Sequence, residues 1–247
     1  KNTKKKIFFE LKNKKKHTVR NNTHTLAPNK APLNGSERPR SPADGQGVTP
    51  LAACHACPLR CKYCPNPQGF PAGPKYPAMT PQELYENVSV DNLYFLATGG
   101  GVTFGGGEPL LYSEFIHDFC RIVPQEWKIC IETSLNVEHN YMEKLLPHIA
   151  HWYIDIKDMD DRIYRKYTGK SNKQVIENLK LLAAHTPQEH ITIRLPLIPN
   201  YYNEKHREAS INTLRNMGFV TFDMLKYITP SPLMHNLKLT YQFHCIL

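Results

Sequence analysis

The sequence predicts an α/β fold in which a partial, open barrel of the (β/α)6 type follows a disordered basic leader. Three observations support this fold class. Short apolar segments of strand character alternate with helical segments along most of the chain, which is typical of a parallel sheet. Three neighbouring predicted strands carry polar residues with a period of two. The predicted strands, five or six in number, are too few for a closed eight-stranded barrel.

Four helices are predicted from their start and stop signals. Thr80 is an expected N-cap, followed by a first-turn proline and by Glu83 as the capping-box acid, for a helix of about 15 residues. Ser113 and Ser171 are the expected N-terminal signals of two further helices, the second with a repeated capping box, and Gly218 is expected to end the last one. These three helices are expected at residues 113–123, 171–185 and 203–218.

Apolar segments between the helices are expected to form the strands of the sheet. They lie at residues 100–104, 128–134, 152–158, 191–198 and 219–228. Strands covered on both faces tend to be apolar throughout, but three of these carry polar side chains at alternate positions. The polar residues are Glu132, Ser134, Asp155, Lys157, Thr192 and Arg194. We expect them to face a shared interior near the C-terminal ends of the strands, where (β/α) barrels place their active sites. A set of structural ion pairs is the alternative.

Composition and charge divide the chain into two parts. Residues 1–45 hold 12 Lys+Arg and 3 Asp+Glu, whereas residues 46–247 hold 19 of each, so the leader carries the whole surplus of the +9 net charge. The leader is too polar to bury much surface and is expected to be disordered. A solvated tail is preferred to an RNA- or membrane-binding arm, so nucleic acid is not an expected partner. Residues 46–247 are the expected folded domain.

The cysteine content points to a reducing compartment. The chain has seven cysteines, four of them within residues 54–64, and it is long enough to build a core without disulfides. It lacks an apolar run of the 18 or more residues that a membrane span needs. A cytoplasmic protein is therefore expected, with no membrane partner.

The spacing of the clustered cysteines discriminates among metal sites. A zinc knuckle normally uses two pairs of ligands set well apart, and the bacterial ferredoxin run has a different spacing and serves two clusters. Without Cys54, the sequence reads C-x3-C-x2-C with Cys57, Cys61 and Cys64. Three thiolates on a [4Fe-4S] cube would leave one iron open to an external ligand. A structural metal knuckle stays the alternative.

A glycine-rich turn follows the first predicted strand of the barrel. Gly105, Gly106 and Gly107 precede Glu108 and a proline. Glycine allows positive φ and a close approach of the backbone to a ligand, and exposed carbonyls beside a carboxylate would suit an ammonium group. The alternative is an ordinary flexible turn between a strand and a helix.

Together these motifs resemble the radical S-adenosylmethionine (SAM) superfamily, and within it the glycyl-radical-enzyme activating enzymes of the pyruvate formate-lyase activase type. The likeness covers residues 43–228 and rests on "CPLRCKYCPNPQ", "GGGVTFGGGEPLL", "YIDIKDMD", "YRKYTGKSN" and "IRLPLIP". It implies a radical SAM barrel with two cofactors, a [4Fe-4S] cluster and SAM. The cluster ligands it implies are Cys57, Cys61 and Cys64.

The resemblance also implies roles for residues around SAM. Gly106, Gly107 and Glu108 should hold the methionyl amino group, and Asp155 and Lys157 should hold other polar groups of SAM, the lysine its carboxylate. Arg194 matches an arginine on the next strand, and Tyr63 stands where an aromatic ring approaches the adenine. Glu132 and Ser134 are the first and last residues of a stretch that, in the family, lies near a bound cation.

The implied reaction is reductive cleavage of SAM to a 5′-deoxyadenosyl radical, which installs a glycyl radical on a partner enzyme. The implied partners are that glycyl radical enzyme and a one-electron donor such as flavodoxin or ferredoxin. The family's arginine is replaced here by Thr49, its CHNP by "CPNP", its serine before GGE by Gly105 and its Tyr-His pair by Tyr227 and Ile228. These departures leave two alternatives: a radical SAM enzyme acting on a small molecule or another peptide, and a non-enzymatic zinc or nucleic-acid-binding module.

Overall fold

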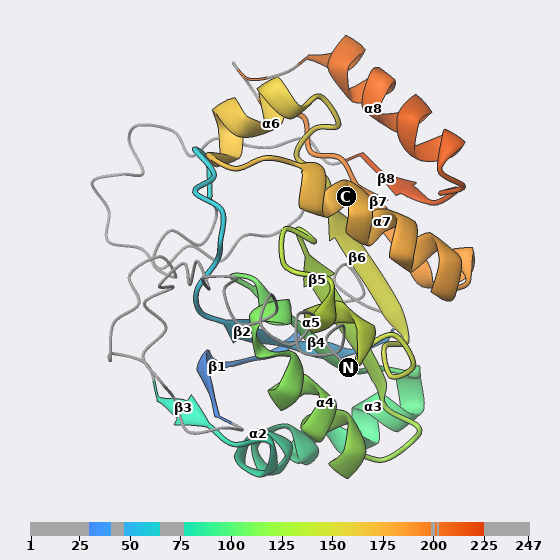
Figure 1. The fold of residues 1–247 in the computed structure, drawn as a ribbon. Helices are drawn as coiled ribbons and strands as arrows, with labels where there is room; N and C mark the ends of the chain where they lie inside the picture. Colours follow the sequence, from blue (N-terminus) through green and yellow to red (C-terminus); the bar gives the residue numbers. More distant parts are fainter. Residues whose placement is uncertain (1–29, 41–46, 65–76, 199–200, 202, 225–247) are drawn as a thin grey trace, which may run out of the picture.

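The computed structural model describes residues 30–40, 47–64, 77–198, 201 and 203–224. Its centre is a sheet with strand order β3-β1-β2-β4-β5-β6-β7-β8 (Figure 1). The last six strands of that order run parallel to one another. They are β2 (Thr49–Cys54), β4 (Gly101–Gly106), β5 (Lys128–Thr133), β6 (His151–Asp155), β7 (Ile191–Arg194) and β8 (Phe222–Asp223). The predicted α/β fold with six parallel strands is confirmed.

Two antiparallel strands extend the sheet at its N-terminal edge. Strand β1 (Ala31–Arg40) pairs with β2, and β3 (Ala78–Met79) pairs with β1. The expected boundary between leader and domain at residues 45 and 46 is therefore wrong, because the sheet already includes residues 31–40. Ala31 and Leu33 are fully buried, and pairing with β2 satisfies the backbone hydrogen-bonding groups of β1. The polar composition of the leader gives no sign of this pairing. The leader's residues 1–29 lie outside the described part of the chain.

The first predicted helix starts as expected but is interrupted. Thr80 Oγ1 accepts a hydrogen bond from the Glu83 backbone N–H (3.2 Å), and a Glu83 carboxylate oxygen accepts one from the Thr80 N–H (2.7 Å), which confirms the capping box. Helix α2 (Pro81–Val88) ends at a short 3-10 turn, η3 (Ser89–Asp91), before α3 (Asn92–Thr98). The Trp127 indole N–H donates to Asn92 (2.7 Å), so a tertiary contact holds the start of the second segment.

The remaining helices alternate with the strands. They are η4 (Pro109–Tyr112), α4 (Ser113–Ile122), α5 (Asn140–Glu143), α6 (Asp161–Thr168), α7 (Lys173–His185), η5 (Gln188–His190) and α8 (Glu204–Asn216). Gly218 has φ +97° just after α8, which confirms it as a terminating residue. Ser113 is not the N-cap of α4, because η4 runs directly into that helix. The capping box expected at Ser171 is also wrong, since its hydroxyl donates to Asp161 (2.7 Å).

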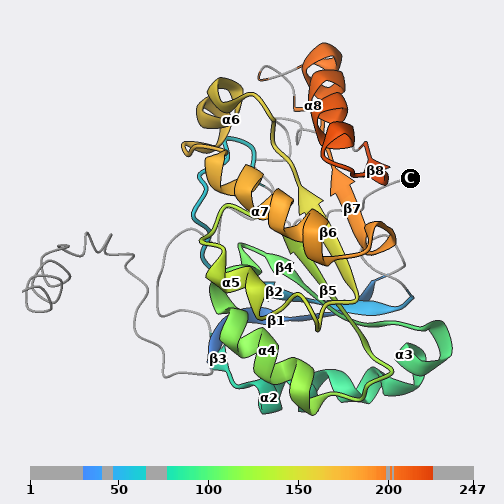
Figure 2. The ribbon, with the colours of Figure 1, turned by 45° about the vertical axis from the view of Figure 1, so that its right-hand side comes forward.

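Alternate faces of the strands separate apolar from polar side chains, as predicted. Helices α4, α5 and α7 lie on the same side of the sheet in both views (Figures 1 and 2). The apolar set is buried in the core: Ile129, Ile131, Trp152, Ile154, Ile156, Ile191, Ile193 and Leu195. Among the residues that the structure describes, none of the helices combines the length and apolar character of a membrane span.

We expect the fold to lose stability in mild acid because of His151 at the start of β6. This imidazole is buried, its Nε2 lies 2.8 Å from Thr192 Oγ1, and burial lowers its pKa from 6.5 to about 4, with His190 and Arg194 adding to the effect. The unfolded chain binds that proton more readily, so the contribution to stability is present above pH 6.5 and is lost as the pH falls toward about 4.

Denaturant unfolding at a series of pH values should show this loss in the parent chain. The free energy of unfolding of His151→Gln should vary less with pH over the same range, whatever its absolute value. The control His185→Gln, at an exposed position, should keep the pH dependence of the parent. An unchanged slope in His151→Gln would assign the acid sensitivity to another group.

Candidate functional site

The candidate site begins in the loop that follows β2, which we call the cysteine loop (residues 55–64). Cys57, Cys61 and Cys64 are half-buried there, whereas Cys54 is buried in β2 itself. Burial raises the pKa of the Cys57 thiol to about 12, and the neighbouring Glu108, Cys61 and Cys64 contribute to the rise. Burial also raises the pKa of Cys61, while nearby Lys157 opposes that shift. The three predicted ligands therefore lie close together, next to the polar strand face.

The glycine turn at the end of β4 holds one side of the cysteine loop through its backbone. The Gly107 N–H donates to the Cys54 carbonyl and the Glu108 N–H to the Ala56 carbonyl, both at 2.8 Å. A Cβ on Gly107 would lie 2.2 Å from the Ala56 oxygen, so only glycine allows this approach. Gly106 has φ +88°, which also favours glycine. Ala56 itself has φ +63°, an uncommon conformation for a non-glycine residue directly before Cys57.

The end of α6 holds the other side of the cysteine loop. The Arg60 N–H donates to the Thr168 carbonyl (2.8 Å) and the Lys62 N–H to the Tyr167 carbonyl (3.1 Å). These carbonyls belong to the last turn of the helix, where they have no partner within it. The Tyr167 hydroxyl also donates to the Tyr63 carbonyl (3.1 Å). Figure 1 shows the loop running from β2 to α6.

An aromatic cluster packs beside this part of the loop. Tyr201 lies edge to face with Tyr63 (5.9 Å between ring centroids) and with Tyr167 (5.1 Å). Cys61 and Ile198 belong to the same apolar group. The contact of Tyr63 with adenine stays a prediction. Its ring packs against Tyr201, and its backbone carbonyl accepts from Tyr167.

Glu108 lies behind the site rather than in its open part. It is fully buried and accepts hydrogen bonds from Thr133 Oγ1 (2.6 Å), Ser134 Oγ (2.7 Å) and the N–H groups of Ser134 (3.0 Å) and Leu110 (3.3 Å). Burial raises the pKa of its carboxyl group, and these hydrogen bonds oppose the rise. These hydrogen bonds position β4 against β5, and the contact of Glu108 with an amino group of SAM stays a prediction.

The predicted polar strand residues form two ion pairs. Lys157 Nζ lies 3.3 Å from Asp155 Oδ2, just after β6. Arg194 Nη1 donates to a Glu132 carboxylate oxygen (2.9 Å). The Arg194 guanidinium also stacks over Tyr153, 4.4 Å from the ring centroid, on the strand between them.

These pairs change the expectations for three residues. The Arg194 guanidinium balances the negative charge of Glu132. The proximity of Glu132 to a bound cation stays a prediction. Ser134 is engaged with Glu108. The direct contact of Arg194 with SAM also stays a prediction, because 9% of its side chain is exposed and its guanidinium is directed at Glu132 and Tyr153.

Two features that support the site were not predicted from the sequence. Helix α6 was not predicted, although Asp160 at its N-terminus and Gly169 after its last residue were usable capping signals. Asn178 on α7 donates to the carbonyls of Leu135 and Val137, both at 2.8 Å, and so holds the loop that follows β5. That contact joins residues more than 40 positions apart and has no local signal.

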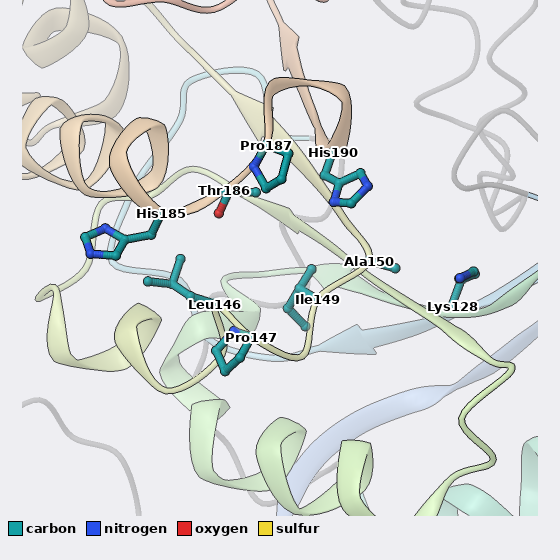
Figure 3. Close-up of a pocket in the computed structure, with 9 residues that line it drawn as sticks. All are labelled: Lys128, Leu146, Pro147, Ile149, Ala150, His185, Thr186, Pro187 and His190. Carbon is teal, nitrogen blue, oxygen red and sulfur yellow. The ribbon is translucent and has the colours of Figure 1, made fainter.

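A separate cavity of about 320 Å³ lies at the opposite end of the sheet (Figure 3). Its lining includes Lys128 at the start of β5, Ala150 just before β6 and His190 just before β7. Because the predicted site residues stand at the C-terminal ends of the same strands, this cavity is not the candidate site.

The comparisons with known proteins identify the family of this arrangement. The signature of the radical SAM superfamily matches residues 53–214. The chain belongs to the radical SAM superfamily. It is 33% identical over 190 residues to the pyruvate formate-lyase-activating enzyme of Clostridium pasteurianum, a match covering 75% of this chain and 78% of that protein. This radical SAM chain is therefore an enzyme of the activating type.

Two further comparisons bear on length and fold. The chain is 39% identical over 124 residues to the (2S)-3-sulfopropanediol dehydratase activating enzyme of Klebsiella oxytoca, and this match spans 50% of the chain but 38% of that protein. The structure of Streptococcus suis SuiB bound to S-adenosylmethionine is 15% identical, with a TM-score of 0.55, covering 72% of this chain and 40% of that one. The latter likeness shows the fold alone.

The cofactors of the superfamily are a [4Fe-4S] cluster and SAM, and the site fits them. Within the described residues, no three His, Cys, Asp or Glu side chains converge on the position of a single metal ion. The cube of a four-iron cluster separates its thiolates, so this finding does not bear on it. Three neighbouring thiols supply the soft donors that iron-sulfur clusters use, and Asp155 and Lys157 place both charge signs beside them.

Proposed function

We propose that this radical SAM enzyme installs a glycyl radical on a partner enzyme. The observation that carries the proposal is the meeting of three thiols with the Asp155–Lys157 pair at the C-terminal ends of the parallel strands. The two activating enzymes named above support the choice of a protein substrate. The competing function is that of a radical SAM enzyme acting on a small molecule or another peptide. It is kept because Thr49 stands in place of the family's arginine and Ile228 in place of its histidine. Ile228 lies outside the described residues.

The residues of this chain bind and orient the cofactors in the proposed reaction. Cys57, Cys61 and Cys64 hold the cluster, and the glycine turn and α6 fix the loop that carries them. The cluster supplies one electron for the cleavage of SAM. Lys157 would hold the carboxylate of SAM, and Asp155, 3.3 Å from the ammonium group of the lysine, would orient that group. The carbonyls of the turn at Gly106 would accept from the amino group of SAM, and Tyr63 would contact its adenine ring.

The test of the proposed function is electron paramagnetic resonance on mixtures of the reduced, SAM-loaded protein with candidate glycyl radical enzymes. An organic glycyl doublet on a partner is the expected result, followed by oxygen-dependent cleavage of that partner's backbone at the radical glycine. Production of 5′-deoxyadenosine without a partner radical across a broad panel would favour the small-molecule or peptide function. A bound zinc ion with no iron would instead favour the binding module.

Lys157→Ala is expected to weaken SAM binding by roughly tenfold or more, because a charged hydrogen bond in a half-buried site is lost. Only 16% of the Lys157 side chain is exposed, so water cannot fully replace its ammonium group. The dissociation constant of SAM is measured by equilibrium binding, together with iron per chain. Iron content should not change, because the cysteines are intact.

Lys180→Ala, on the exposed surface of α7, is the matched control and should bind SAM as the parent does. Parent-like SAM affinity in Lys157→Ala would show that this ammonium group does not face the ligand.

A further inference from the structure

A buried tyrosine hydroxyl lies at the same end of the sheet as the candidate site. Tyr164 is on α6, which follows β6, and only 1% of it is exposed. Its oxygen accepts a hydrogen bond (3.1 Å) from the side-chain amide of Asn136, in the loop that follows β5. Cys57 and Cys61 pack against the same core to which the Tyr164 ring belongs. The fold therefore brings this hydroxyl to the C-terminal ends of the strands, beside the cysteine loop.

The contacts of Asn136 determine which way the hydroxyl proton points. The same side-chain nitrogen also donates to the Ser171 carbonyl (2.7 Å). A backbone carbonyl can only accept, so the NH2 group of Asn136, and not its oxygen, lies between Ser171 and Tyr164. The Tyr164 oxygen is therefore the acceptor of the bond from Asn136, and its own proton is directed elsewhere.

That proton has no acceptor among the residues that the structure describes, where the bond from Asn136 is the one hydrogen bond of the Tyr164 hydroxyl. A buried O–H group that donates to nothing has lost its hydrogen bond to water without replacement, and native cores rarely keep such a group. An acceptor on a bound cofactor would remove this cost.

The charged neighbours of the hydroxyl indicate which cofactor supplies the acceptor. Burial raises the pKa of Tyr164 above its ordinary value, so the phenol keeps its proton at neutral pH. Among the charged side chains, Cys61 has the largest effect on this pKa, followed by Lys157 and Glu108. The hydroxyl is thus a neutral donor near a predicted cluster ligand, and the sulfur atoms of iron-sulfur clusters accept hydrogen bonds.

We propose that the Tyr164 hydroxyl donates a hydrogen bond to a sulfur atom of the bound cluster and so raises the reduction potential of that cluster. Reduction adds one electron, taken from an external reductant, and the extra negative charge strengthens a hydrogen bond donated to sulfur. The proton stays on the tyrosine oxygen throughout. This inference goes beyond the proposed function, because it holds whichever substrate receives the radical.

The test is the midpoint potential of the cluster in Tyr164→Phe, which removes the hydroxyl and keeps the ring. The anaerobically reconstituted chain is titrated without SAM or partner, and the reduced cluster is followed by electron paramagnetic resonance. We expect a more negative potential, with the reduction equilibrium changed roughly tenfold, or about 59 mV for one electron. Iron and sulfide per chain should match the parent, because Cys57, Cys61 and Cys64 are intact.

Asn136→Ala is the matched control. It removes the same hydrogen bond between Asn136 and Tyr164 but leaves the donor on the tyrosine. Its potential should therefore stay at the parent value, which separates loss of the donor from loosening of the contact between α6 and the loop after β5. If Tyr164→Phe lost iron, 3-fluorotyrosine at position 164 would take its place. That side chain is a stronger donor with the same ring, so it should shift the potential in the positive direction.

An unchanged potential in Tyr164→Phe would overturn the proposal, as would an equal shift in Asn136→Ala. A parent-like potential together with weakened SAM binding would show that the hydroxyl serves SAM beside Lys157 and not the cluster. Since the titration contains neither SAM nor a partner enzyme, its result is independent of whether a glycyl radical forms in the test of the proposed function.

Discussion

Replacing Cys61 with alanine is expected to abolish cluster binding, whereas replacing Cys54 with alanine should leave the cluster in place. Cys61 lies in the cysteine loop beside Cys64, Asp155 and Lys157, all of which influence its pKa. Cys54 lies within β2, is 2% exposed, and its thiol is directed at the Ala52 carbonyl (3.8 Å). Burial raises the pKa of the Cys54 thiol well above its usual value, which suits a small buried side chain in the core.

The measurement is iron and sulfide per chain after anaerobic reconstitution, with the visible absorption of the cluster. Cys61→Ala should fall to background in all three and lose SAM cleavage. Cys54→Ala should retain parent values, with a loss of stability of about 1 kcal/mol from the small cavity. Loss of iron in Cys54→Ala with an intact fold would mean that the ligand set has been misassigned.

Gly107→Ala is expected to remove most of the bound cluster although residue 107 is not a ligand. The added methyl group would lie 2.2 Å from the Ala56 carbonyl oxygen and 2.9 Å from that of Cys54. Both oxygens belong to backbone that carries the ligand loop, so relief of the collision must break the hydrogen bonds from Gly107 and Glu108. Overpacking of this kind costs about 1–3 kcal/mol and displaces the loop from the sheet.

Gly99→Ala separates this effect from the general cost of a side chain. Gly99 has φ +67°, and a methyl group there would meet nothing within 4 Å. The variant should lose about 1–2 kcal/mol from backbone strain and keep its iron. The two variants should therefore lose similar amounts of stability in thermal unfolding but differ in iron content. A cluster-loaded Gly107→Ala would show that the loop is not anchored at this turn.

Local patterns were sufficient to predict the parallel sheet. Ile154 and Ile156 alternate with Asp155 and Lys157, and this period of two identifies both the strand and its buried face. The capping box at Thr80 is similarly complete within four residues. Strand β1 was missed because its stability comes from pairing with β2, a partner that no local pattern in residues 31–40 identifies.

The residues of the candidate site could be predicted from the sequence, but the contacts among them could not. The spacing of Cys57, Cys61 and Cys64 predicts a cluster, with a structural metal knuckle as the alternative, and the glycine turn and polar strands favour the cluster. The burial of Glu108 depends on Thr133 and Ser134, which are 25 and 26 residues away, and the pairing of Glu132 with Arg194 spans 62 residues. These partners meet only when neighbouring strands are in register, so the sequence could identify charged groups at the site without showing which of them remain available to a ligand.

The support of the cysteine loop by α6 has a consequence for the order of biosynthesis. The loop leaves the ribosome long before the helix, since Tyr63 and Tyr167 are 104 residues apart in the chain. At about 5–20 residues per second, the interval is roughly 5–20 s. During that time the thiols are present but the carbonyls that hold Arg60 and Lys62 are not. Stable insertion of the cluster must therefore wait for the second half of the barrel, and the nascent chain depends on the cell to keep its cysteines reduced until then.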